Sequence, residues 1–284
     1  MSAPRVLVVD GNVEDIRRRL IEAVGDDTAT GYARVLRRLR PDIECDIAYP
    51  ADVHLVAELA GALDRYDGVA ITGSALCIAD GGRAVERQVD LARRVFDHGV
   101  PLFGSCWGLQ VAVVAAGGIV ESNPLGREFG FARRILLTEA GRAHPLFLDK
   151  PAVFEAPTVH RDHVARLPEG AQVLAVNEMG VQAATFSHRR GTCWGVQYHP
   201  EYDYGDIRAV ARRYGTALVD AGLFTGPEDL EDFAADMAVL QADPACEALL
   251  WKHGLGPAMR AEPLRLRELA NWLTLQVEPR ACSR

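Results

Sequence analysis

The sequence predicts an α/β fold: a mostly parallel sheet flanked by helices, then an antiparallel extension and a C-terminal helical appendage. Three observations support this prediction. Up to residue 115, short apolar segments alternate with segments of helical periodicity. From about 118 to 199, short strand-like segments follow one another without long helices. Beyond residue 205 the apolar spacing is helical again.

The first part of the chain supplies the parallel strands. Its expected elements are, in order, a strand at 5–9, helical turns within 14–40 that a loop at 25–31 interrupts, strands at 43–48 and 68–72, a helix at about 83–98, a strand at 101–104 and a helix at 107–115. Strands that alternate with helices form a parallel sheet with helices on both faces, which here predicts a flavodoxin-like arrangement. Active sites in such sheets lie beyond the carboxyl ends of the strands.

The second part is expected to extend the sheet and then to add helices. Its expected strands lie at 118–121, 132–137, 172–176, 181–186 and 192–198, and its helices at 206–221, 227–240 and 264–277. We predict two units, a domain 1–204 and a C-terminal helical extension 205–284 packed on it. Burying a leucine side chain contributes roughly 1.5–3 kcal/mol, so the apolar last helix should dock on its own chain. The alternative is that it covers a second subunit or an acceptor enzyme.

The composition is that of an acidic protein with enough apolar residues for a large core. The 284 residues are 49% hydrophobic and carry a formal net charge of −8, which argues against nucleic acid as the main partner. No apolar run approaches membrane length and the N-terminus does not resemble a signal peptide, so we expect a cytoplasmic location without membrane contact. Six cysteines without C-x-x-C spacing indicate neither zinc nor disulfides, and five of them are expected as small buried side chains.

The sixth cysteine, Cys106, stands where a short apolar strand must turn sharply into a helix. Gly104 and Gly108 flank it in the thiol version of the nucleophile-elbow pattern, and glycines there avoid a Cβ clash in the turn. The positive end of the following helix favours the thiolate over the thiol. This pattern predicts a nucleophile for attack on a carbonyl carbon.

A thiolate needs a base that takes and returns its proton, and the base needs an orienting group. The segment 191–201 supplies both, because His199 stands at the end of an apolar strand and Glu201 follows two residues later. Pro200 cannot donate to a sheet ladder and stiffens the turn between them. The predicted catalytic order is Cys106, His199, Glu201.

Together these segments resemble the class I, triad-type glutamine amidotransferases, in a stand-alone domain similar to the glutaminase domain of GMP synthetase. The family pattern G-x-C-x-G-x-Q matches Gly104, Cys106, Gly108 and Gln110. The second pattern, G-[Val/Ile]-Q-[Phe/Tyr]-H-P-E, matches 195–201 without a gap, and the resemblance covers about 5–203. It implies that the chain hydrolyses glutamine to glutamate and ammonia without a cofactor.

The same resemblance implies an oxyanion hole made by the backbone of Trp107 and of the loop after the third strand. The family has a glycine pair in that loop, where this chain has Gly73 and Ser74. Gln110 lies one helical turn past the nucleophile and, with Gly104, is expected to border the substrate.

The segment 158–164 resembles the Ser-His-x-Asp stretch that borders the family's glutamine pocket, with Val159 in the serine position. His160 and Asp162 are therefore candidate substrate-binding residues. Two histidines and an aspartate within 160–163 could also indicate a metal, but the third ligand with suitable spacing is missing, so no metal is expected. Glu128 is a further pocket candidate, although an acid exposed in a turn is the favoured interpretation.

Three functions remain open at this point. The first is a glutamine amidotransferase or glutaminase that passes ammonia to a separate acceptor or synthetase subunit. The second is a hydrolase or transferase that acts on another γ-glutamyl amide by the same thiol chemistry. The third is a non-catalytic binding subunit on the same fold, which the complete Cys106, His199 and Glu201 set disfavours.

Overall fold

The computed structural model describes residues 3–52 and 61–283. Its central feature is a nine-stranded sheet with the order β2-β1-β3-β4-β11-β10-β9-β6-β7. Five neighbouring strands run parallel: β2 (Glu44–Ala48), β1 (Arg5–Val9), β3 (Gly68–Ile71), β4 (Leu102–Ser105) and β11 (Gly191–Val196). Their carboxyl ends therefore meet at one edge of the sheet.

The other four strands continue the same sheet in antiparallel fashion. They are β10 (Gly180–His188), β9 (Gln172–Asn177), β6 (Glu128–Leu137) and β7 (Val153–His160). A separate antiparallel ribbon pairs β5 (Ile119–Ser122) with β8 (Asp162–Arg166). The predicted α/β class, with a parallel sheet and an antiparallel extension, is confirmed.

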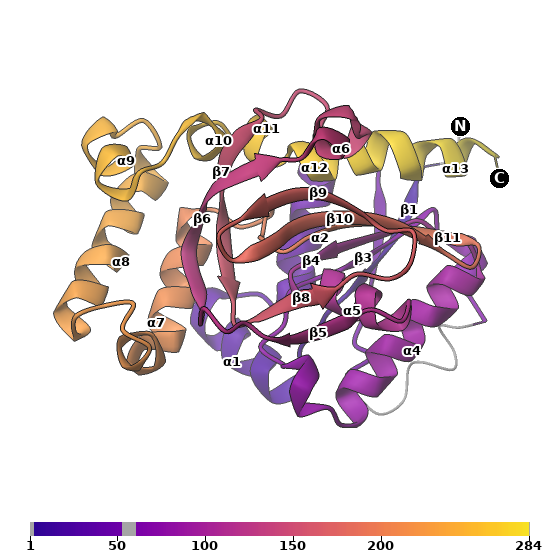
Figure 1. Cartoon of the computed structure of the whole chain (residues 1–284), viewed down its shortest axis with the longest axis horizontal. Coiled ribbons are helices and arrows are strands. Elements are labelled where there is room, and N and C mark those ends of the chain that lie inside the picture. Colours follow the sequence, from indigo (N-terminus) through magenta and orange to yellow (C-terminus); the bar gives the residue numbers. More distant parts are fainter. Residues whose placement is uncertain (1–2, 53–60, 284) are drawn as a thin grey trace.

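Helices cover both faces of the parallel strands (Figure 1). One face packs against α2 (Thr28–Leu39), and the other against α4 (Arg83–Asp97) and α5 (Trp107–Ala115). The remaining elements of this part are α1 (Glu14–Val24), α6 (Glu139–Ala143) and the 3-10 turns Leu63–Arg65, Ile78–Asp80 and Pro145–Phe147. Strand β1 is buried on both faces from Val6 to Val9, which explains the uninterrupted apolar sequence of these four residues.

The C-terminal region is helical, as predicted, but its last segment is not one regular helix. It comprises α7 (Tyr204–Asp220), α8 (Pro227–Ala242), α9 (Glu247–His253), α10 (Pro257–Arg260), α11 (Glu262–Arg265), α12 (Arg267–Trp272), a π-helical turn Leu273–Val277 and α13 (Glu278–Ser283). In Figure 1, α8 and α9 stand beside the sheet at the left, whereas α12 and α13 run along its upper edge.

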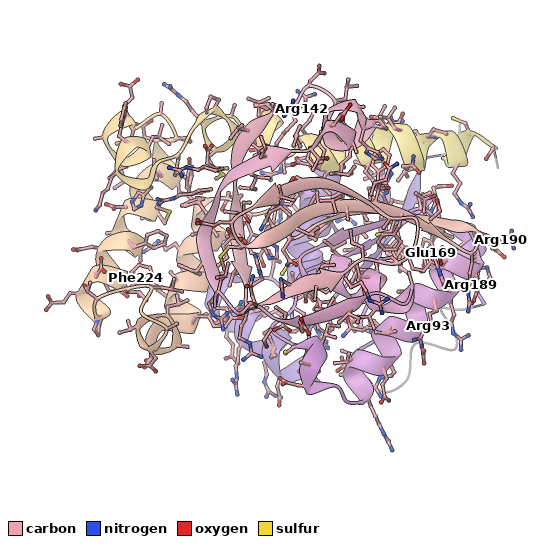
Figure 2. The ribbon with its side chains drawn as sticks, viewed as in Figure 1. Arg93, Arg142, Glu169, Arg189, Arg190 and Phe224 are labelled. Carbon is pink, nitrogen blue, oxygen red and sulfur yellow. The ribbon has the colours of Figure 1, made fainter. Side chains whose placement is uncertain are left out.

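Apolar contacts in at least two places attach this region to the sheet domain. Trp272 is fully buried, with its ring centroid 5.6 Å from that of Phe103 on β4. On the other side, Phe224 packs against Phe129 and Phe233, and Figure 2 shows it beside α7 and α8. The labelled charged side chains in Figure 2 lie instead at the periphery: Arg93, Arg142, Glu169, Arg189 and Arg190.

Two strands were not predicted from the sequence, β7 and β8. Strand β7 contains Pro157, which is unfavourable inside a sheet but tolerated here because β7 is the last strand of the sheet order. Strand β8 begins with the polar residues Asp162 and His163, which do not show the period of a buried strand. Within the described residues, no helix is both long and apolar enough to cross a membrane.

Candidate active site

Cys106 lies between β4 and α5 in a strained conformation, with φ 52° and ψ −103°. Its N–H donates to the Val196 carbonyl at 2.8 Å, which holds the turn against the end of β11. A Cβ on Gly104 would lie 2.4 Å from the carbonyl carbon of Gly108, and one on Gly108 would lie 2.2 Å from the Ile71 oxygen. The two glycines therefore allow α5 to start directly against the strand ends, and the sulfur is held at that edge.

His199 follows β11 and is fixed by contacts on three sides. Its N–H donates to the Pro157 carbonyl of β7 at 2.8 Å, and its Nδ1 donates to Glu201 Oε1 at 2.7 Å. The Tyr202 ring stacks on the imidazole at a centroid distance of 4.1 Å and an angle of 5°. His199 and Glu201 are both buried, so this is an ion pair shielded from water.

The charge on His199 depends on this carboxylate. Burial lowers the pKa of His199, but Glu201 and the neighbouring Cys106 outweigh burial and raise it to about 10. The Nε2 atom is buried and has no hydrogen-bond partner among the described residues. Catalytic hydrogen bonds are often loose without substrate and close when it binds. An imidazolium at this position is a group that can give a proton to a departing amine.

A chain of polar groups leads away from Glu201. Its Oε2 accepts a hydrogen bond from Ser105 Oγ at 3.1 Å, and that hydroxyl lies 3.1 Å from the Tyr32 hydroxyl. All three groups are buried. Both oxygens of the carboxylate are therefore occupied, which fixes its orientation toward His199.

The predicted oxyanion loop passes directly beneath the imidazole. A Cβ on Gly73 would lie 2.4 Å from His199 Cε1, so only glycine fits there without displacing the ring. Ser74 Oγ donates to the Gly11 carbonyl at 2.8 Å and accepts from the Leu76 N–H at 3.0 Å. Neither Gly73 nor Ser74 adopts a positive φ, so serine replaces the family's second glycine without backbone strain.

A cavity of about 170 Å³ opens at the sulfur of Cys106. Its lining combines backbone from the loop after β3, the start of α5 and the end of β7 with charged side chains. The lining residues are Ser74, Ala75, Leu76, Cys77, Asp80, Cys106, Trp107, Gln110, Arg127, Val159, His160, Arg161, Asp162 and Tyr214. The geometry thus brings Trp107 and Ser74 together with the nucleophile, while their role as oxyanion donors stays a prediction.

The predicted substrate residues meet at this cavity, with one exception. Gln110 is buried and donates to the Asp162 carbonyl at 3.2 Å, so it is not a solvent-facing helix residue. His160 Nδ1 lies 3.0 Å from the same carbonyl. Gly104 is not among the lining residues, and its lack of a side chain is explained by the contact with Gly108.

The structure corrects the interpretation of Glu128 as an acid exposed in a turn. It begins β6, and its Oε2 lies 2.8 Å from His160 Nε2 while its Oε1 accepts from Asn177 at 2.6 Å. Gln182 donates to it as well, at 3.2 Å. Glu128 therefore supports the cavity wall from behind. Its position on a strand depends on pairing with β7, which local sequence does not reveal.

Sequence reasoning also missed several members of the cavity, among them Cys77 and Tyr214. Cys77 is buried, as expected for the five other cysteines, but its Sγ lies 2.8 Å from Asp162 Oδ2 and 3.1 Å from Arg161 Nη2. Tyr214 comes from α7, far along the chain. Of the remaining cysteines only Cys193 is buried; Cys45 and Cys246 are half-buried and Cys282 is exposed.

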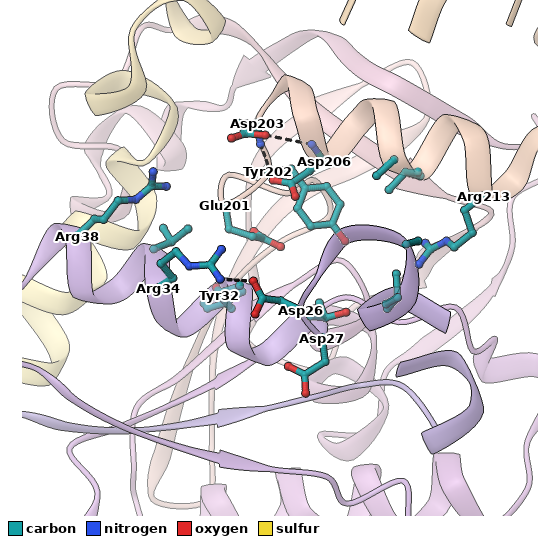
Figure 3. A pocket seen from close by; sticks show the side chains of 17 residues that line it. Asp26, Asp27, Tyr32, Arg34, Arg38, Glu201, Tyr202, Asp203, Asp206 and Arg213 are labelled. Atoms are coloured by element: carbon teal, nitrogen blue, oxygen red, sulfur yellow. Dashed lines mark hydrogen bonds and ion pairs between the residues drawn. The ribbon is translucent and has the colours of Figure 1, made fainter. Parts of the chain in front are cut away.

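A second cavity, of about 200 Å³, lies behind Glu201 between α2 and the start of α7 (Figure 3). Figure 3 shows acidic and basic side chains around it, among them Asp26, Arg34, Asp206 and Arg213. Cys106 is not part of its lining. Of these two cavities, therefore, the first is the one that reaches the thiol.

Comparison with known proteins identifies one family and several similar proteins. Residues 31–210 match the family described as glutamine amidotransferase class-I. A γ-glutamyl-L-1-hydroxyisopropylamide hydrolase from a Pseudomonas species is 34% identical over 99% of this chain and 96% of its own length. A glutamine-hydrolysing GMP synthase from Nitrosomonas eutropha is 32% identical over 69% of this chain, which spans only 37% of that protein. A glutamine amidotransferase structure from Thermotoga maritima aligns over 95% of this chain and 99% of its own, with TM-score 0.61 and 18% identity.

Proposed function

Because the chain belongs to the class I glutamine amidotransferase family, we propose that it hydrolyses the γ-amide bond of γ-glutamyl amides of small amines through a thioester on Cys106. The observation that carries the proposal is the buried arrangement of Cys106, His199 and Glu201, in which Cys106 lines the cavity of about 170 Å³. It provides a nucleophile, a proton donor and an orienting carboxylate in one place.

In the proposed first step the Cys106 thiolate attacks the amide carbonyl carbon and forms a C–S bond. Negative charge develops on the carbonyl oxygen, where the backbone N–H groups of Trp107 and the 73–74 loop would stabilise it. The C–N bond then breaks, and the His199 imidazolium gives its proton to the departing amine. Glu201 holds the imidazole through Nδ1 during this transfer.

In the second step water hydrolyses the thioester. His199, now neutral, takes a proton from the water, and the resulting oxygen nucleophile attacks the acyl carbon. The C–S bond breaks, glutamate leaves, and the thiolate–imidazolium pair returns. No metal or cofactor takes part in this sequence, which uses only groups of the described site.

The choice of γ-glutamyl amide over glutamine alone rests on the extent of the similarity. The relative that hydrolyses a γ-glutamyl hydroxyisopropylamide aligns along nearly the whole chain, including the C-terminal helices. The similarity to GMP synthase supports a second candidate, a glutaminase that passes ammonia to a separate synthetase subunit.

The test is hydrolysis of a substrate panel by the purified full-length chain. Glutamine, γ-glutamyl methylamide and γ-glutamyl isopropylamide are compared, with glutamate release as the readout for all three. We expect kcat/KM for a substituted amide to equal or exceed that for glutamine. Hydrolysis of glutamine alone would favour the glutaminase, and failure on all three would favour a binding subunit.

A further inference from the structure

Tyr214 occupies the junction of three spaces in the molecule. It lines the cavity of about 170 Å³ at Cys106, a gap of about 10 Å³ beside His199, and a groove of about 790 Å³ between α1 and α7. Ala75 also borders all three. The ring therefore stands where the inner spaces would otherwise open into the groove.

The gap beside His199 is the space that a departing amine must enter. Its lining includes Gly73, His199 and Tyr202 as well as Tyr214. Because His199 supplies the proton in the proposed mechanism, the nitrogen of the scissile amide must face this side. A volume of about 10 Å³ corresponds to roughly one water molecule. Ammonia fits such a space, whereas a substituted amine needs the wall to move.

Two guanidinium groups contact the ring of Tyr214, and its helix is interrupted directly after it. The guanidinium carbons of Arg127 and Arg213 each lie 4.9 Å from the centre of its ring. The next residue, Gly215, has φ 23° and ψ −101°, so α7 is interrupted immediately after the tyrosine. The ring is thus clamped between the start of β6 and α7, on a backbone that is not continuous helix.

Tyr214 also lies outside the part of the chain that matches the amidotransferase family, which ends at residue 210. The nucleophile, base and loop that face the carbonyl all lie inside that part. From this position and from the size of the gap, we infer that Tyr214 sets the size of the amine that the site releases. This inference rests on the proposed function, whose amine would otherwise reach the groove between α1 and α7.

The experiment compares hydrolysis of glutamine, γ-glutamyl isopropylamide and γ-glutamyl benzylamide by wild type, Tyr214→Ala and Tyr214→Phe. Wild type should hydrolyse the isopropylamide at least as well as glutamine and lose activity with the bulkier benzylamide. Tyr214→Ala should raise the benzylamide-to-glutamine ratio of kcat/KM by about tenfold or more, since differences of a few carbon atoms in a pocket have effects of this size. Tyr214→Phe keeps the ring and should keep the wild-type ratio. Thr216→Ala, an exposed position on the same helix, should leave activity and ratio unchanged.

A second readout does not depend on turnover. The rates at which 2-iodoacetamide and N-benzyl-2-iodoacetamide alkylate Cys106 are measured by mass spectrometry in the same variants, after thermal melts confirm folding. Tyr214→Ala should selectively accelerate labelling by the benzyl reagent. A wild type that hydrolyses none of the amides would overturn the proposed function, while the labelling ratio would still decide the role of Tyr214. Unchanged ratios in Tyr214→Ala would overturn the inference.

Discussion

The parallel and antiparallel halves of the sheet contribute differently to the site. The parallel half brings Cys106, His199 and the 73–74 loop together, because the carboxyl ends of β3, β4 and β11 meet at one edge. The antiparallel half, with β8 and α7, supplies walls of the cavity, with Glu128 behind them: Val159, His160, Arg161, Asp162 and Tyr214. In the proposed mechanism the first set would face the bond that breaks, and the second would line the rest of the substrate space. Under that proposal, reactivity and selectivity have separate structural sources.

Removing the nucleophile should have the largest effect. Cys106→Ser should lower kcat by more than about 10⁴-fold, because the other groups have no thiolate to act on. A diazo-ketone analogue of glutamine should alkylate wild type at Cys106 and leave the variant unmodified, as read by peptide mass spectrometry. Cys77→Ser is the matched control, since Cys77 lines the same cavity. Alkylation at Cys77 with Cys106 untouched would reverse the assignment.

Removing the base should have the next largest effect. His199→Ala should lower kcat by about 10²–10⁴-fold, the usual contribution of a general acid and base. The measurement is glutamate release at saturating substrate, with a thermal melt to show that the variant is folded. A kcat within a factor of two of wild type would contradict the proposed role.

Substitutions in the C-terminal helices should lower the free energy of unfolding more than they lower the activity. Trp272→Ala should lower the free energy of unfolding by about 3–5 kcal/mol, because the ring is fully buried against the sheet. Leu275→Ala, at a position that is 37% exposed, should change it by less than about 0.5 kcal/mol. Urea denaturation gives both values.

Deleting 262–284 tests whether this last segment docks on its own chain. If the truncated protein keeps its melting temperature and light scattering shows a changed number of subunits, this segment is an association element and not an internally docked one.

The charge on His199 gives a prediction in pH. In Glu201→Gln the pKa of His199 should fall from about 10 toward its ordinary value of 6.5, because burial is then opposed only by Cys106. In wild type the raised pKa stabilises the fold fully below pH 6.5, and this contribution is lost as the pH rises through about 10. NMR titration of labelled imidazole measures the pKa. A value near 10 in the variant would show that Glu201 is not its source.

The smallest effect is expected for the cavity wall. Asp162→Asn should raise KM by about tenfold while kcat changes less than threefold, since a charged hydrogen-bond acceptor is lost from the substrate side and not from the reacting atoms. Steady-state kinetics with glutamine and one substituted amide give both constants. An equal loss in kcat would show that Asp162 also affects the reacting atoms and would contradict separate roles for the two halves of the sheet.

The sequence by itself determined the elbow, the order of Cys106, His199 and Glu201, and the α/β class. These follow from local rules: glycines where two backbones touch, an apolar strand before each functional residue, and alternation of strands with helices. The family motifs add the expected roles. In each case the signal lies within a few neighbouring residues, so it can be recognised before the chain folds.

Only the tertiary structure decided what surrounds these residues. Strand β7 contains Pro157 and was not predicted from the sequence. Its Pro157 carbonyl accepts the His199 N–H, and its Val159 carbonyl oxygen lies 3.6 Å from the Cys106 sulfur. The sequence indicated an exposed acid in a turn at Glu128, whereas the pairing of β6 with β7 places it on a strand. Tyr214 reaches the cavity from α7. These contacts join segments that are far apart in the chain, and their partners are specified by packing. Local periodicity carries no information about such partners, whereas it does describe the strand and the turn that hold the nucleophile.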